Sequence, residues 1–153
     1  MKYNFKTCFQ VLNLLLIGMV ILSSCSKDDD DDPSDNLVEF SNIEINGAEE
    51  VPPNNSTATG IFNGTYDKTT KILTYTLTYS GVMATNMHFH EGAVGVSGPV
   101  VIPIGEAPFS SPINDVTPVL TEEQEADLLA GNWYVNIHSE DFPPGEIRGQ
   151  VVQ

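Results

Sequence analysis

The sequence predicts an all-β fold, an antiparallel β-sandwich or barrel with one short connecting helix. Two observations support this fold class. Seven or eight short segments have the pattern of β-strands, and glycine and proline residues stand between them. One segment, which begins at Thr121, has a helical pattern instead. Hydrophobic residues make up 41% of the 153 residues, which suits about one domain with its own core.

The most regular strand runs from Leu73 to Tyr79, where leucine and tyrosine alternate with threonine. Such alternation places one face of a strand in the core and the other in water. A polar turn at Asp67–Lys71 separates this strand from an earlier alternating run at residues 57–64. The two runs are therefore expected to form an antiparallel hairpin.

The other expected strands are shorter. Their ranges are 38–40 and 43–45, with an irregularity at Ser41–Asn42, and then 86–90, 100–104, 133–138 and 146–152. The expected helix begins with a capping box at Thr121–Gln124, and Gly131 suits a left-handed stop. We expect this helix to lie over one end of the sandwich.

The first 24 residues predict a lipoprotein signal peptide. Lys2 and Lys6 precede an apolar run that is shorter than the roughly 20 residues of a spanning helix. The run ends in Leu22-Ser23-Ser24-Cys25, which resembles the bacterial lipobox. That resemblance implies cleavage before Cys25 and its acylation with fatty acids such as palmitate. An ordinary secretory signal with a chance cysteine is the alternative.

Residues 25–36 predict a tether between the lipid and a domain at residues 37–153. Lys27 is followed by five consecutive aspartates, whose mutual repulsion favours an extended, solvated segment. Capture of Ca²⁺ is an alternative, although the spaced ligands of a calcium loop are missing. The run also resembles the export signal of some Gram-negative lipoproteins. We therefore expect an envelope protein anchored to the outer membrane and facing outward.

Charge and cysteine content exclude two further features. The formal net charge is −15 with only six lysine and arginine residues, so the chain cannot form the basic surface that nucleic-acid binding needs. Cys8 leaves with the signal peptide and Cys25 is the lipidation site. The mature domain therefore contains no cysteine for a disulfide.

The chain has only three histidines, and all three fall in expected strands. His88 and His90 are two residues apart, so both rings point to one face of their strand. His138 ends the strand that begins at Trp133, on the face opposite its apolar residues. If the two strands are neighbours, three imidazoles meet in a site for Zn²⁺ or copper with an open fourth position. Alternatively, the rings bond to loop carbonyls or to Glu91 and Glu140.

Arg148 is the only arginine of the chain. It shares one face of the last strand with Glu146 and Gln150. It either forms a salt bridge with Glu146 or Glu140, or it is a fixed positive group beside the histidines that guides an anion. Gly149 within this strand indicates a close backbone approach or a bulge.

Several segments together resemble the CHRD domain, a family named from chordin, over roughly residues 38–152. They are Asn46–Pro53, Gly60–Phe62, Met87–Gly92, Leu120–Gly131, Asn132–Ser139 and Pro144–Gln150. The resemblance implies an immunoglobulin-like β-barrel, distantly similar to Cu,Zn superoxide dismutase. In that comparison His88 and His90 match the copper ligands, and His138 and Arg148 match a later copper ligand and an anion-guiding arginine. The histidines of a separate zinc site and the disulfide are missing.

Two classes of function remain open. The first is a lipid-anchored, surface-displayed binding or structural module without catalysis, because no nucleophile motif, Walker loop, Rossmann fingerprint or zinc-protease motif occurs. An adhesion domain belongs to this class. The second is a metal-binding protein that uses His88, His90 and His138, and this class includes a vestigial dismutase-like redox activity. The sequence names no ligand, protein partner or oligomeric state.

Overall fold

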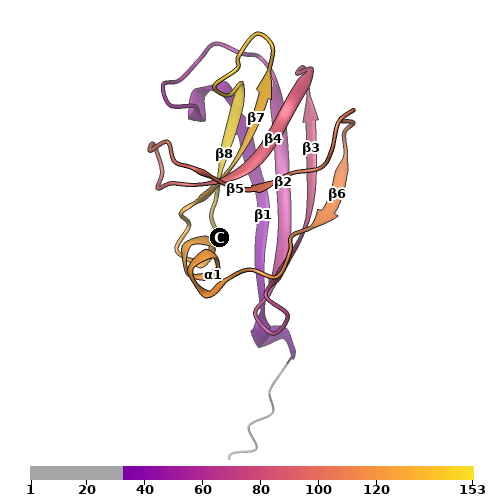
Figure 1. Ribbon diagram of the computed structural model, residues 1–153, viewed down its shortest axis with the longest axis vertical. Helices are drawn as coiled ribbons and strands as arrows, with labels where there is room; N and C mark the ends of the chain where they lie inside the picture. The colour runs from indigo at the N-terminus through magenta and orange to yellow at the C-terminus, as the bar shows by residue number, and fades with distance from the viewer. Residues whose placement is uncertain (1–32) are drawn as a thin grey trace, which may run out of the picture. The chain divides into compact units, whose positions relative to one another are not determined.

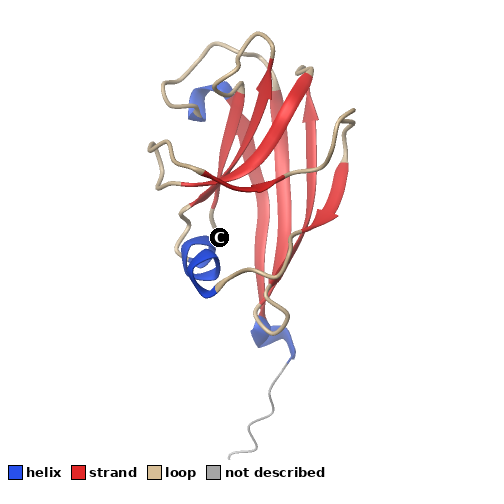
Figure 2. Ribbon diagram, viewed as in Figure 1, coloured by secondary structure: helices blue, strands red, loops and turns tan. Residues whose placement is uncertain are grey.

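A computed structural model describes residues 33–153 and places them in one antiparallel sheet of eight strands with one α-helix (Figures 1 and 2). The strands are β1 Leu37–Asn46, β2 Thr59–Asp67, β3 Ile72–Ser80, β4 Ala84–Glu91, β5 Val100–Pro103, β6 Ile113–Val116, β7 Trp133–Ser139 and β8 Ile147–Val151. Their order in the sheet is β5-β4-β7-β8-β1-β2-β3-β6. The helix is α1 Glu122–Leu129, and two 3₁₀-helices are η1 Pro33–Asn36 and η2 Gly47–Glu49. The predicted all-β class with one short connecting helix is confirmed.

The sheet curls so that its two halves, β5-β4-β7-β8 and β1-β2-β3-β6, enclose a common core. Phe89 of β4 lies 5.7 Å from Phe62 of β2 and 5.2 Å from Tyr75 of β3, measured between ring centroids. Both pairs meet edge to face, the arrangement that aromatic quadrupoles favour. These contacts join strands of opposite halves, so the core is sandwich-like although hydrogen bonds connect all eight strands.

The two halves join where β1 meets β8. Asn46 pairs with Arg148 at this junction. A β-carbon on the next residue, Gly149, would lie only 2.5 Å from the carbonyl oxygen of Glu44. The close backbone approach predicted from Gly149 is therefore confirmed, and it explains why a residue without a side chain stands in this strand.

The predicted hairpin is strands β2 and β3, which pair from Asp67 with Ile72 to Thr59 with Ser80. The predicted irregularity in the first strand is also present. The register of β1 against β2 shifts between Phe40 and Ile43, and Asn42 there has a φ of 57°. The two short strands expected at 38–40 and 43–45 are thus one bulged strand, β1.

Helix α1 begins and ends as its sequence predicts. The Thr121 hydroxyl accepts from the Gln124 amide at 3.2 Å, and the Gln124 side chain accepts from the Thr121 amide at 3.0 Å. Gly131 follows the helix with a φ of 73°. Leu128 is fully buried, so the helix packs on the core at the end of the sheet where β7 begins. No helix among residues 33–153 is long and apolar enough to span a membrane.

One strand was not predicted from the sequence, and the predictions for the N-terminal segment fall largely outside the described residues. Strand β6 is an additional strand, paired with β3 from Leu77 with Ile113 to Thr74 with Val116. The signal peptide, Cys25 and the acidic run lie outside the described residues. The last four residues of the predicted tether, Pro33–Asn36, form η1, and the Asn36 carbonyl accepts from the Lys68 amide at 2.9 Å.

Candidate metal centre

The three histidines reach one face of the sheet from the neighbouring strands β4 and β7. In β4, Met87 and Phe89 are fully buried and the histidines between and beyond them point to the other face. In the register between the strands, His138 pairs with Asn86 and His88 pairs with Asn136. His138 is therefore diagonal to His88, within reach of a long side chain. The adjacency of β4 and β7 is what brings the predicted trio together.

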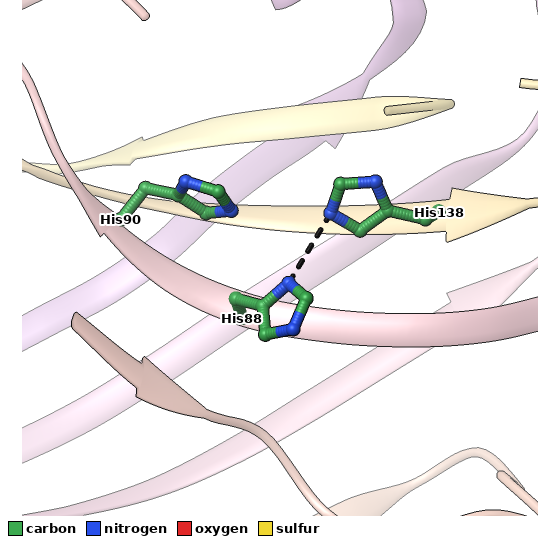
Figure 3. A group of neighbouring side chains, drawn as sticks. All are labelled: His88, His90 and His138. Atoms are coloured by element: carbon green, nitrogen blue, oxygen red, sulfur yellow. Dashed lines mark hydrogen bonds between the residues drawn. The ribbon is translucent and has the colours of Figure 1, made fainter. Parts of the chain in front are cut away.

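The imidazole rings turn toward one another (Figure 3). His88 Nδ1 lies 3.3 Å from His138 Nε2. Taking one nitrogen from each of His88, His90 and His138, all three lie within 4.8 Å of one another. Nitrogens bound to one tetrahedral ion at 2.0–2.1 Å would lie about 3.3 Å apart. The hydrogen-bonded pair already has this spacing, so the separation of the three rings suits a single ion.

The outer nitrogens of two rings are held by backbone carbonyls. His90 Nδ1 lies 3.0 Å from the Gly98 carbonyl oxygen, and His138 Nδ1 lies 2.9 Å from that of Pro143. Each ring therefore donates from Nδ1 and carries its lone pair on Nε2, where His138 accepts a hydrogen bond from His88 Nδ1 at 3.3 Å. Ligand histidines in metal proteins are fixed in the same way, by a carbonyl or carboxylate on the other nitrogen.

His90 Nε2 is buried and has no hydrogen-bond partner. Buried polar atoms are almost always paired, because an unpaired one forfeits its hydrogen bond to water. A lone pair that faces two further imidazoles has a simple partner in a metal ion. This atom, together with an all-nitrogen donor set, fits Zn²⁺ or copper.

The site favours neutral rings, which can bind a metal. Burial lowers the pKa of His88, and the nearby rings of His138 and His90 lower it further. Burial also lowers the pKa of His90, against the opposing effect of its hydrogen bond to Gly98. Both rings are thus neutral at pH 7, where each offers a lone pair.

Arg148 lies beside the cluster but is engaged by its neighbours. Its guanidinium carbon stands 3.5 Å from the centroid of the Tyr134 ring, a cation–π contact. It donates to the Ala93 carbonyl at 3.2 Å and to Gln150 Oε1 at 2.9 Å. Within residues 33–153 the ion pair is Lys71 with Glu125, so the predicted salt bridge of Arg148 with Glu146 or Glu140 is not formed.

Tyr134 was not predicted as a residue of the site, and it supports the ring of His90. The Tyr134 ring stacks on His90 at 4.9 Å between centroids and 13° between planes. Its hydroxyl accepts from the Gly98 amide at 3.1 Å, the residue whose carbonyl binds His90. Tyr134 alternates with the apolar residues of β7, so its face was predictable, but its burial was not, because a loop distant in sequence covers it.

A buried carboxylate lies in the same layer. Glu50 is 8% exposed and accepts a hydrogen bond from the Asn136 side chain, which itself lies opposite His88. Burial raises the pKa of Glu50, while Asn136 and the charge of Arg148 oppose the rise. No role was predicted for Glu50 from the sequence, which placed it in the Asn46–Pro53 segment. The structure shows that it bonds to Asn136 on the outer face of β7.

Comparison with known proteins identifies the domain. The family model of the CHRD domain matches residues 41–151, which include all three histidines, Glu50, Tyr134 and Arg148. No curated protein and no solved structure matches the chain significantly. The likeness to Cu,Zn superoxide dismutase therefore stays a prediction. The family match covers well over half of the 153 residues, and the chain belongs to the CHRD domain family.

Proposed function

We propose that this CHRD domain is a binding module whose ligand is one Zn²⁺ or Cu²⁺ ion, held by His88, His90 and His138. The observation that carries the proposal is the convergence of three imidazole nitrogens, one of them buried and without a partner, from two strands. Three protein ligands leave a fourth position for water or for an outside group. The net charge of −15 favours the approach of cations.

The module binds metal without catalysing a redox reaction on it. A dismutase-like reaction needs an anion to approach, and the surrounding charge repels anions. Arg148, the only candidate for guiding one, is 2% exposed and already bonded to Ala93 and Gln150. Copper-loaded protein is therefore expected to turn over superoxide no faster than buffer without copper. Faster turnover that is lost in His90→Ala would establish the redox alternative.

Metal binding is tested by titrating metal-free, full-length protein with Zn²⁺ and Cu²⁺ in a calorimeter. One ion per chain is expected. His88→Ala, His90→Ala and His138→Ala should each weaken binding by more than about a hundredfold, because each removes a direct ligand. Thr74→Ala, an exposed residue of β3 in the other half of the sheet, is the control and should bind as the wild type does. No bound ion, or equal affinity in all variants, would refute the proposal.

We propose further that lipid on Cys25 holds the module at the outer membrane, facing outward. The support is the lipobox Leu22–Cys25 and the acidic segment that follows it. Several acyl chains give firm anchoring, since each buried methylene contributes about 0.8 kcal/mol. Cys25→Ser should abolish labelling by radioactive palmitate and release the protein from membranes, and surface proteolysis of intact cells should digest the wild type. Retention of Cys25→Ser in the membrane fraction would contradict the anchor.

A further inference from the structure

The two ends of the curled sheet are closed differently (Figure 1). Helix α1 packs its buried Leu128 at the end where β7 begins. At the other end, where β7 finishes at Ser139, no α-helix of the described residues covers the core. A groove of about 730 Å³ opens there, formed by residues 79, 81–85, 108–109, 139–141 and 146. We name it the mouth groove. Its volume is in the range of sites that hold ligands of a few hundred daltons.

One wall of the mouth groove is apolar. It is formed by the β3–β4 connection, with Val82 and Met83, and by the β5–β6 connection, with Pro108 and Phe109. The Met83 side chain is 89% exposed, and Phe109 is half-buried against the core. A flexible thioether beside an aromatic ring adapts to apolar side chains of different shapes. This wall therefore suits a large hydrophobic group.

The wall contributed by the β7–β8 connection is acidic. Glu140 and Asp141 are both exposed on it, and Glu146 below them accepts a hydrogen bond from Ser56 at 2.7 Å. Neither lysine nor arginine lines the groove, so these carboxylates are not neutralised by groove residues. A cationic group of a ligand would complement this wall, whereas an anion would be repelled.

We infer that the mouth groove binds a cationic amphipathic peptide in an extended conformation. Successive side chains of an extended chain point to opposite sides. A lysine or arginine then faces Glu140 and Asp141 while the adjacent apolar residue rests on Met83 and Phe109. The groove lies at the open end of the core, and the three histidines lie on the outer face of β4 and β7. The peptide therefore contacts none of the three histidines, although the groove and His138 share the β7–β8 connection through Pro143.

The test uses full-length protein and a fluorescent hexapeptide of alternating phenylalanine and lysine. Binding is measured by fluorescence anisotropy. The peptide is expected to bind, and affinity should fall at least about fivefold when serine replaces phenylalanine or glutamate replaces lysine. The double variant Glu140→Gln/Asp141→Asn should bind the original peptide about fivefold more weakly, as expected for two exposed ion pairs. Phe109→Ser should weaken it by a similar factor or more.

The matched control is Glu122→Gln/Glu123→Gln, which removes the same charge from exposed residues of α1 at the other end of the sheet. It should leave peptide affinity unchanged. Three outcomes would overturn the inference. They are no saturable binding of the peptide, an equal loss in the α1 control, which would indicate attraction by net charge alone, and equally tight binding of spermine, which would indicate a site for cations without an apolar component.

Discussion

Strands β4 and β7 carry a different chemistry on each of their two faces. The inner face is apolar and fully buried, with Met87, Phe89, Val135 and Ile137 in the core. The outer face carries the histidine trio together with Tyr134 and Asn136. Both faces exclude water over much of their area, because Tyr134 is 4% and Asn136 is 2% exposed. The same backbone thus supports one layer that depends on packing and another that depends on hydrogen bonds.

This difference separates stability from ligand binding. The inner face gains free energy from non-directional burial, so losing volume there should weaken the whole fold. The outer face depends on individual hydrogen bonds, such as those from His90 to the Gly98 carbonyl and from His138 to the Pro143 carbonyl. When one such hydrogen bond is lost, the imidazole ring is no longer held in its binding orientation. The main effect should be on metal affinity, with the fold little changed.

The largest effect is expected from Phe89→Ala on the inner face. Phe89 is fully buried and meets Phe62, Tyr75 and Trp133, so its loss leaves a cavity between the two halves of the sheet. The free energy of unfolding should fall by about 3–5 kcal/mol, as measured by urea denaturation. Val100→Ala, at an exposed residue of the edge strand β5, should cost well under 1 kcal/mol. A loss of that small size in Phe89→Ala would show that the halves do not depend on this contact.

The sequence predicts which residues of each strand face the core, but it does not predict which strands lie next to each other in the sheet. Alternation within residues 86–90 and 133–138 assigns the histidines to the face opposite the core, and the structure agrees. Whether His138 joins His88 and His90 depends on β4 lying next to β7, which 41 intervening residues, Gly92–Asn132, do not encode locally. From the sequence, the three histidines could therefore be predicted to meet only if β4 and β7 were neighbours.

Two other features escaped the sequence because distant contacts create them. Strand β6 has only four residues, Ile-Asn-Asp-Val, mostly exposed and without a buried alternating face. It is extended because its backbone bonds to β3. The burial of Tyr134 and Glu50 arises from loops that fold over the outer face, such as the one that ends at Gly98. Local patterns carry no signal for either kind of contact.

A smaller effect, confined to metal binding, is expected from Tyr134→Phe on the outer face. The variant keeps the ring that stacks on His90 but removes the hydroxyl that bonds to Gly98. The Gly98 carbonyl then holds His90 less firmly, and affinity for Zn²⁺ should fall about tenfold by calorimetric titration. Urea denaturation of the metal-free variant should show a much smaller loss than that of Phe89→Ala.

Tyr79→Phe is the matched control for this prediction. It removes a buried tyrosine hydroxyl that has no hydrogen-bond partner, from a residue that lines the mouth groove. Its Zn²⁺ affinity should equal that of the wild type. If Tyr134→Phe also binds Zn²⁺ with unchanged affinity, the hydroxyl does not position His90, and the stacking contact or the strand itself fixes the ring.

The smallest effect is expected from Glu50→Gln, and it concerns pH. Burial holds the pKa of Glu50 above its ordinary value in the folded state. A carboxyl group with a raised folded pKa stabilises the fold fully below its unfolded pKa, and this contribution is lost as pH rises through the folded pKa. Between about pH 4 and pH 7 the wild type should therefore lose stability relative to Glu50→Gln.

Glu49→Gln separates this effect from the repulsion among the many carboxylates. Glu49 is the exposed neighbour of Glu50, and its removal changes the net charge by the same amount. Urea denaturation across the pH range should give a curve for Glu49→Gln that stays nearly parallel to the wild type, while the curve for Glu50→Gln diverges upward with pH. Equal divergence of both variants would assign the pH dependence to net charge. The burial of Glu50 would then make no separate contribution to the pH dependence, and its role would be the hydrogen bond that it accepts from Asn136.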